Sequence, residues 1–215
     1  MALLKPFVTK TFTAYAGDTR TSTVSLAIWL VDEVTRQSSA TAVTVSLKEI
    51  TRKPIKNSSG YYCFTDLAAG DYTVVVEPDP IQSGWYFKED VSVTIPMPKR
   101  SEPVQEIMLK PTPAYPFPHL LTLVRGFVTE RTNGNRVGLN NIPVYRLKEN
   151  NERDVESKTT HNGEFVLYIK DFTVEEGQDG MEITIEAEKD GIKEQRTFAI
   201  PQEGVTVTID VEFTP

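Results

Sequence analysis

Short runs in which apolar and polar residues alternate recur along almost the whole chain, and this two-residue period predicts β-strands. Val, Thr, Ile, Tyr and Phe dominate the runs, while Gly, Pro, Asn and Asp bound them. No long segment has the 3.6-residue period of an amphipathic helix. The expected fold class is therefore all-β. Strands are predicted at 7–13, 21–33, 42–49, 60–65, 71–77, 90–95, 104–109, 121–130, 142–148, 155–160, 163–170, 181–188, 192–199 and 205–213.

The two halves of the chain have similar patterns. Each opens on a long strand, "TSTVSLAIWLVDEVTR" or "LTLVRGFVTERTNG", and each later turns at a glycine into an aromatic alternation, "SSGYYCFTDL" or "HNGEFVLYIKDF". Seven short strands in about 100 residues, with turn signals every 8–12 residues, are typical of a β-sandwich. The pattern predicts two tandem seven-stranded sandwiches.

A proline-rich segment separates the two halves. "PTPAYPFPH" at 111–119 holds four prolines, and such a run stays extended and acts as a semi-rigid spacer. We expect a first domain at 1–110, this linker, and a second domain at 120–215. Tyr115 and Phe117 are expected to pack on the flanks of the two domains. A proline-rich ligand for an aromatic groove is the alternative interpretation of the segment.

The stretch "NSSGYYCFTDLAAGDYTVVV" at 57–76 is a conspicuous motif that could be either a functional site or a β-hairpin. Asn57 to Gly60 form a turn in which the glycine takes a positive φ without strain. Tyr62 and Phe64 then share one strand face, and Tyr61 and Cys63 the other. Every residue of the stretch has a role in folding, so the sequence predicts a hairpin here and no chemistry.

The same stretch resembles the glycine–aromatic–Leu–Gly–Tyr signature of the carboxypeptidase regulatory-like, or transthyretin-like, β-sandwich family. "LVRGFVTE", "LNNIPVYRL" and "TTHNGEFVLYI" of the second half resemble it as well. The resemblance implies two transthyretin-like modules that act as non-catalytic accessories. The second half departs from the family pattern, because the longer acidic loop "KDFTVEEGQDGME" replaces the compact Leu-x-x-Gly loop.

Composition narrows the possible partners. The net charge is −7, and the whole excess of acidic residues lies after residue 115. A protein that binds nucleic acid needs a basic surface, so this charge argues against such a role. No run approaches the roughly 20 apolar residues that span a bilayer, and "MALLKPFVTKTFTAY" lacks the pattern of a signal peptide. We therefore expect a cytoplasmic protein, with later release as part of a particle as a further option. Its single cysteine, Cys63, allows no intrachain disulfide.

Catalytic chemistry is not indicated by any motif. His119 ends the proline-rich segment, and His161 lies in "THNG", which is predicted as a type I′ hairpin turn; neither has the spacing of a metal pair. Cys63 lies between aromatic residues and is predicted to be a buried, inert thiol. We expect no enzyme, cofactor or metal. The acidic residues Glu175, Glu176, Asp179 and Glu182 are interpreted as a solvated loop, with a calcium site as the alternative.

These features predict a non-enzymatic structural or interaction protein, a subunit or adaptor that docks onto a larger assembly. Association into a homo-oligomer is a further option. The tandem pattern is similar to accessory proteins of phage-tail-like contractile injection particles, which would make other protein subunits its partners. The alternative is a carbohydrate- or ligand-binding module that uses an aromatic loop. The candidate interaction patch consists of Trp85, Tyr86, Phe87, Tyr115 and Phe117.

Overall fold

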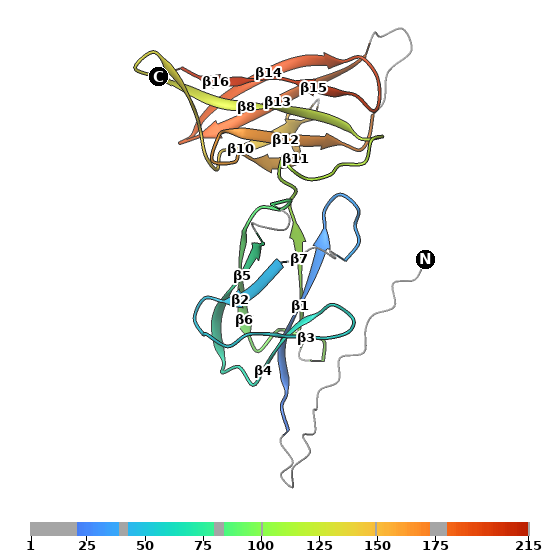
Figure 1. The fold of residues 1–215 in the computed structure, drawn as a ribbon, viewed down its shortest axis with the longest axis vertical. Helices are drawn as coiled ribbons and strands as arrows, with labels where there is room; N and C mark the ends of the chain where they lie inside the picture. The colour runs from blue at the N-terminus through green and yellow to red at the C-terminus, as the bar shows by residue number, and fades with distance from the viewer. Residues whose placement is uncertain are drawn as a thin grey trace. The chain divides into compact units, whose positions relative to one another are not determined.

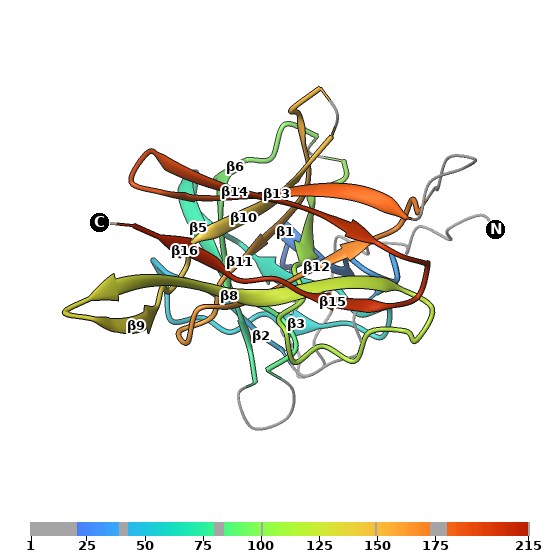
Figure 2. The ribbon, with the colours of Figure 1, turned by 90° about the horizontal axis from the view of Figure 1, so that it is seen from above.

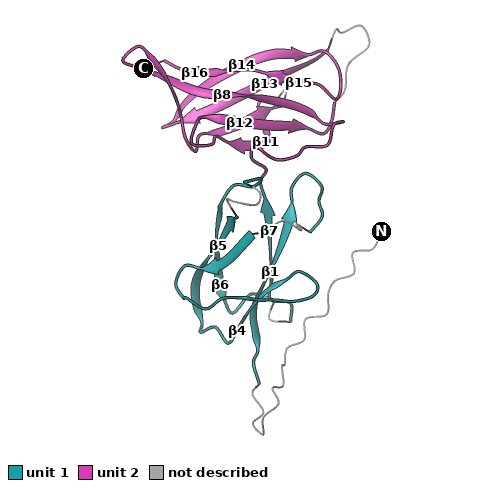
Figure 3. Cartoon of the chain, in the orientation of Figure 1, with its two compact units in different colours: residues 1–110 teal, residues 111–215 magenta. Residues whose placement is uncertain are grey.

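The computed structural model describes residues 21–38, 43–79, 84–99, 101–148, 150–172 and 180–214. Every regular element in these ranges is a β-strand, which confirms the all-β prediction. No helix in the described ranges is long and apolar enough to cross a bilayer. The chain divides into two compact units, Met1–Lys110 and Pro111–Pro215 (Figure 3). The strand predicted at 7–13 lies outside the described residues.

The described residues of the first unit form seven strands in two sheets, whose arrangement can be followed in Figure 1. One sheet has the order β3-β4-β1-β7 and the other the order β2-β5-β6. The last strand, β7, runs parallel to the first, whereas β4 lies antiparallel on the other side of β1. The strands are β1 (Val24–Asp32), β2 (Val43–Leu47), β3 (Ile55–Lys56), β4 (Tyr62–Thr65), β5 (Gly70–Pro78), β6 (Glu89–Ile95) and β7 (Val104–Leu109).

Strand β1 has buried apolar side chains on both of its faces. Leu26, Ile28 and Leu30 are buried on one face together with Phe64 of β4. On the opposite face Ala27 packs with Tyr61 and Cys63, and the Trp29 and Tyr61 rings lie 4.5 Å apart. Each large apolar side chain buried in this way contributes about 1.5–3 kcal/mol to the stability of the fold. Strand β1, which lies between β4 and β7 in its sheet, therefore contributes to the packing on both sides of that sheet.

The turn at 57–60 forms as predicted. Gly60 has φ +89°, and its N–H donates to the Asn57 carbonyl oxygen. The Asn57 side-chain oxygen accepts the backbone N–H groups of Ser59 and Tyr61 at 3.0 and 2.9 Å. A side-chain amide that replaces backbone acceptors in this way is the Asx-turn chemistry typical of asparagine.

In the part of the second unit that the structure describes there are nine strands, and Figure 2 shows them from above. One sheet has the order β11-β10-β13-β14; the other is built around β8, which pairs with β12, β15, β9 and β16. The strands are β8 (Thr122–Thr132), β9 (Asn135–Gly138), β10 (Pro143–Leu147), β11 (Arg153–Lys158), β12 (Glu164–Ile169), β13 (Met181–Lys189), β14 (Ile192–Ile200), β15 (Thr206–Thr208) and β16 (Val211–Phe213).

The two units repeat one strand arrangement. In each, the first strand pairs antiparallel with the strand that follows the glycine turn and parallel with the end of the unit. The seven-strand count is wrong for the second unit, because β9 is an added strand and the run predicted at 205–213 breaks into β15 and β16. The short β3 and β9 were both missed. The turn at Asn162-Gly163 also differs from type I′, since only Gly163 has a positive φ.

Candidate functional site

The aromatic loop of the predicted patch is largely packed against the first unit. Tyr86 is only 4% exposed, and its hydroxyl donates a 2.5 Å hydrogen bond to the buried Asp32 carboxylate. Trp85 and Phe87 are half-buried, and the Phe87 N–H donates to the Lys110 carbonyl oxygen. Tyr86 is therefore buried and hydrogen-bonded at the end of β1, and an interaction role for the patch stays a prediction.

The aromatic residues of the proline-rich segment pack within the second unit. Tyr115 is buried and meets the Phe117 ring edge-on, with 4.8 Å between ring centroids. Phe117 in turn lies 6.2 Å from the Tyr168 ring of β12. The Arg125 guanidinium holds the segment by donating to the Pro113 carbonyl oxygen at 2.8 Å. Residues 113–117 thus cover part of β8 and β12, and Phe117 is the more accessible of the two predicted patch residues.

The remaining candidates do not converge. His119 and His161 are both exposed, and Cys63 is 6% exposed, with burial raising the pKa of its thiol. The acidic residues Glu175, Glu176 and Asp179 lie outside the described residues. Within the described ranges, no group of three or more His, Cys, Asp or Glu side chains is placed to hold a metal ion.

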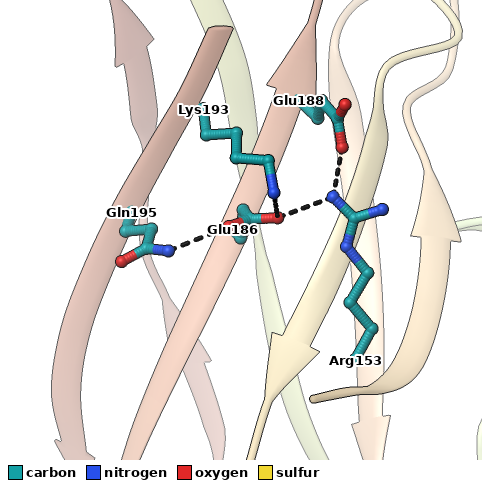
Figure 4. Close-up of polar contacts among 5 residues, drawn as sticks. All are labelled: Arg153, Glu186, Glu188, Lys193 and Gln195. Atoms are coloured by element: carbon teal, nitrogen blue, oxygen red, sulfur yellow. Dashed lines mark hydrogen bonds and ion pairs between the residues drawn. The ribbon is translucent and has the colours of Figure 1, made fainter. Parts of the chain in front are cut away.

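A polar network that the sequence analysis did not predict lies on the outer face of the sheet β11-β10-β13-β14 (Figure 4). Alternation along β13 sends Ile183, Ile185 and Ala187 into the core, so Glu186 points to the opposite face. The register places Glu186 beside Tyr145 of β10 and Gln195 of β14. The Glu186 side chain is nonetheless only 4% exposed, because long side chains from neighbouring strands close over it.

Three side chains donate to the Glu186 carboxylate. Arg153 of β11 binds Oε1 at 2.7 Å, Gln195 binds Oε2 at 2.8 Å, and Lys193 lies 3.4 Å from Oε1. The Arg153 guanidinium also pairs with Glu188 and lies 3.8 Å from the centroid of the Tyr145 ring. The network therefore connects β11, β10, β13 and β14 across the full width of the sheet.

The electrostatics of the network favour a permanently charged carboxylate. Burial raises the pKa of Glu186, but hydrogen bonds from Arg153, Gln195 and Lys193 together outweigh burial and hold the pKa below its usual value. The hydrogen bonds that Arg153 donates, to Glu186 first and to Glu188 second, raise the pKa of Arg153. A general acid or base needs a pKa near the working pH. Glu186 has the opposite shift, so the geometry suits a clamp between strands and not proton transfer.

A second charged cluster has the same character on the sheet around β8. Glu212 of β16 pairs with Arg131 at 2.5 Å and with Arg136 at 3.1 Å, and Asp210 accepts the Phe127 N–H at 3.1 Å. These contacts join β8, β9 and β16, and the hydrogen bond from Arg131, with both cations nearby, lowers the pKa of Glu212. Both clusters hold strands together.

Comparison with known proteins gives only distant likeness. No family model matches the chain, and the search of curated proteins found no match. Among solved structures, a minor pilin of Streptococcus agalactiae aligns with TM-score 0.34 and 10% identity over 88% of this chain and 96% of that one. The Bacillus anthracis TIE protein aligns with TM-score 0.33 and 15% identity, covering 90% of this chain but only 34% of its own. The shaft pilin SpaA of Lactobacillus rhamnosus GG gives TM-score 0.26 and 10% identity.

Proposed function

We propose that this chain is a non-catalytic structural subunit, built from two transthyretin-like β-sandwich units, that docks onto other proteins of a larger assembly. The observation that carries this proposal is the Glu186 network. Its one well-buried carboxylate is saturated by three donors, and its pKa is lowered. This polar network of the second unit therefore serves stiffness and not reaction chemistry.

The chain also offers what an assembly subunit needs. Among the described residues, the sheets of each unit end in strands with a neighbour on one side only, such as β6 and β14. The backbone groups of such an edge can pair with a strand from another protein. Two similar units in tandem would present such edges twice. The resemblance of the sequence to carboxypeptidase regulatory-like modules, which are non-catalytic accessories, supports the same role.

A more specific form of the proposal names the assembly. The sequence pattern is similar to accessory proteins of phage-tail-like contractile injection particles, which assemble in the cytoplasm. On this hypothesis the chain is made and docked in the cytoplasm and leaves the cell only within the particle. A pilus-like surface assembly is the rival, and the two differ in where the protein is found and in what it is bound to.

Gentle lysis of the native host, followed by sedimentation and mass spectrometry of the fast fraction, tests both forms. Recovery of the tagged chain in particles of megadalton size, with recurring protein companions, supports the subunit role, and sheath- or tube-like companions support the contractile particle. A chain that sediments alone as a protein of 24.1 kDa contradicts the subunit role. A variant with Phe117→Ser and Trp85→Ser, two half-buried aromatic positions of the predicted patch, tests whether that patch contributes to docking.

A further inference from the structure

Strand β14 forms one edge of the sheet β11-β10-β13-β14. All nine of its residues, Ile192 to Ile200, pair with β13 in unbroken antiparallel register. In the described part of the chain, the backbone hydrogen bonds of β14 all go to β13. About half of its N–H and C=O groups therefore point away from the sheet. Figure 1 shows β14 as one of the longest strands of the second unit.

The sequence of this edge is self-complementary. When "IKEQRTF" (192–198) is laid antiparallel against a second copy with Gln195 opposite Gln195, Glu194 comes opposite Arg196 and Arg196 opposite Glu194. In the same register Ile192 faces Phe198, and Lys193 faces Thr197. Facing pairs of opposite charge and facing apolar pairs each stabilise an antiparallel ladder. We infer that β14 is a self-association edge, through which two copies of this chain join their sheets.

Only one register has this property. A two-fold axis perpendicular to the sheet keeps each side chain on its own face, so some residue must face its own copy. A shift of the axis to Glu194 or to Arg196 places two like charges directly opposite, which destabilises the pair. Gln195 is the neutral residue between them, and its amide can both donate to and accept from the amide of a second copy.

The exposure of these side chains fits the proposed contact. Ile192 is 57% exposed and is one of the few large apolar side chains of the second unit that stand in solvent. Glu194 is half-buried, Arg196 is exposed, and Phe198 is half-buried against the core. In the paired register, each Ile192 would be covered by Phe198 of the other copy. Charged side chains often protect an edge from pairing, but here the two charges have opposite signs and match each other.

The other edge of the same sheet provides a contrast. Strand β11 reads "RDVESK", and self-pairing centred on Val155 places Asp154 opposite Glu156, whereas centring on Glu156 places two glutamates together. Centring on Ser157 does bring Glu156 opposite Lys158, but it pairs Val155 with Thr159 and so provides no facing apolar pair. Moreover, Arg153 and Asp154 are already bound within the unit. A dimer through β14 would instead extend the Glu186 network, because Gln195 donates to Glu186 and would face Gln195 of the second copy.

Charge reversal tests this inference with matched variants. Sedimentation equilibrium of the full chain should show dimers, and Glu194→Arg alone or Arg196→Glu alone should weaken dimerisation about tenfold or more, because each creates two like-charge pairs. The double variant Glu194→Arg/Arg196→Glu should restore the wild-type constant, since it exchanges the signs and keeps the match. A chain that stays monomeric up to about 1 mM, or a dimer that the single reversals leave unchanged, overturns the inference.

Cysteine probes check the register. Gln195→Cys should form an interchain disulfide under mild oxidation, because facing Cβ atoms lie about 5 Å apart. Lys193→Cys should not, because its own copy would stand four residues away, roughly 13 Å along the strand. Crosslinking of both to the same extent contradicts this register. The inference rests on the proposed subunit role, but the two can fail separately. A monomer that still enters large particles refutes self-association through β14 and leaves the subunit role standing. A β14 dimer that has no other protein companions refutes docking onto a larger assembly and leaves self-association standing.

Discussion

Gly126 of β8 lies directly against the carbonyl oxygen of Ile209, so that a Cβ atom at position 126 would stand 1.7 Å from that oxygen. The contact occurs where the partner of β8 changes from β15 to β16. The Ile209 N–H donates to the Arg125 carbonyl oxygen at 2.8 Å, which holds the two backbones together. The close approach of two backbones at this point therefore requires glycine.

Gly126→Ala should lower the free energy of unfolding by about 3 kcal/mol, because neither backbone can move away without loss of that hydrogen bond. The measurement is urea denaturation followed by far-UV circular dichroism. Gly191→Ala is the matched control: Gly191 has φ +82° with open space around it, so the loss should be only about 1 kcal/mol of backbone strain. Equal losses for the two variants would contradict a rigid approach at Ile209.

The Glu186 network predicts a defined pH dependence. The pKa of Glu186 is lower in the folded chain than the ordinary value of 4.5, so the folded state binds its proton less readily than the unfolded state. The stabilisation is complete above pH 4.5 and is lost as the pH falls through the lower, folded value. Wild-type stability should therefore decline in that acidic range.

Glu186→Gln should remove about 1–2 kcal/mol at pH 7 and should flatten this decline, because the amide carries no charge for Arg153 or Lys193 to bind. The control is Glu182→Gln, an exposed position on the same strand, which should keep the wild-type pH profile. Denaturation series from pH 7 to about pH 3 measure both. A profile for Glu186→Gln that parallels the wild type would show that other carboxylates, such as Glu212, cause the decline.

The hydrogen bond between Tyr86 and Asp32 predicts that removal of the Tyr86 hydroxyl lowers the free energy of unfolding. Tyr86→Phe leaves one oxygen of a buried carboxylate without its 2.5 Å donor, although the other oxygen keeps the Val34 and Thr35 N–H groups. We expect a loss of about 1–3 kcal/mol. Tyr72→Phe, whose hydroxyl contacts the Ala68 carbonyl oxygen at an exposed site, should cost less than about 0.5 kcal/mol. Tryptophan fluorescence reports both, because Trp29 and Trp85 lie in the first unit.

Alternation was sufficient to predict most strands because the buried faces repeat every second residue, as Leu26, Ile28 and Leu30 do. It was insufficient for β3 and β9, which are short and expose most of their side chains. Their position follows from hydrogen bonding to a longer partner, and no apolar pattern marks that. The break between β15 and β16 was missed for a related reason, since it depends on Gly126, which lies more than 80 residues earlier in the chain.

The candidate site was harder to predict than the fold. The alternation of β13 implies that Glu186 and Glu188 share the outer face, and the turn to β14 implies Lys193 and Gln195 as neighbours. Arg153 enters through two further strand pairings, whose registers no local pattern supplies. Trp85, Tyr86 and Phe87 look alike in sequence, and only the buried Asp32 partner shows that Tyr86 faces inward; the interaction role of the patch stays a prediction.

Asn57 and Thr160 occupy the same position in the glycine turns of the two units. We expect that exchanging the residue type at these two positions changes the stability of the chain in opposite directions. Each donates its N–H across the turn, to Tyr61 or Glu164, and accepts the N–H of Gly60 or Gly163. The Asn57 amide oxygen additionally accepts two backbone N–H groups. Thr160 has instead a buried hydroxyl oxygen for which the described residues supply no hydrogen-bond partner.

Thr160→Asn should therefore stabilise the chain by about 1 kcal/mol, because it replaces an unsatisfied hydroxyl with an acceptor that the turn can use, and Asn57→Thr should destabilise it by a similar amount. Thr160→Val separates the two contributions: it removes the hydroxyl without adding an acceptor, so its gain should be smaller than that of Thr160→Asn. Thermal and urea denaturation of the three variants measure the effects. A loss of stability in Thr160→Asn would mean that the second turn lacks room for the amide, and that the two turns share a backbone conformation without sharing its side-chain chemistry.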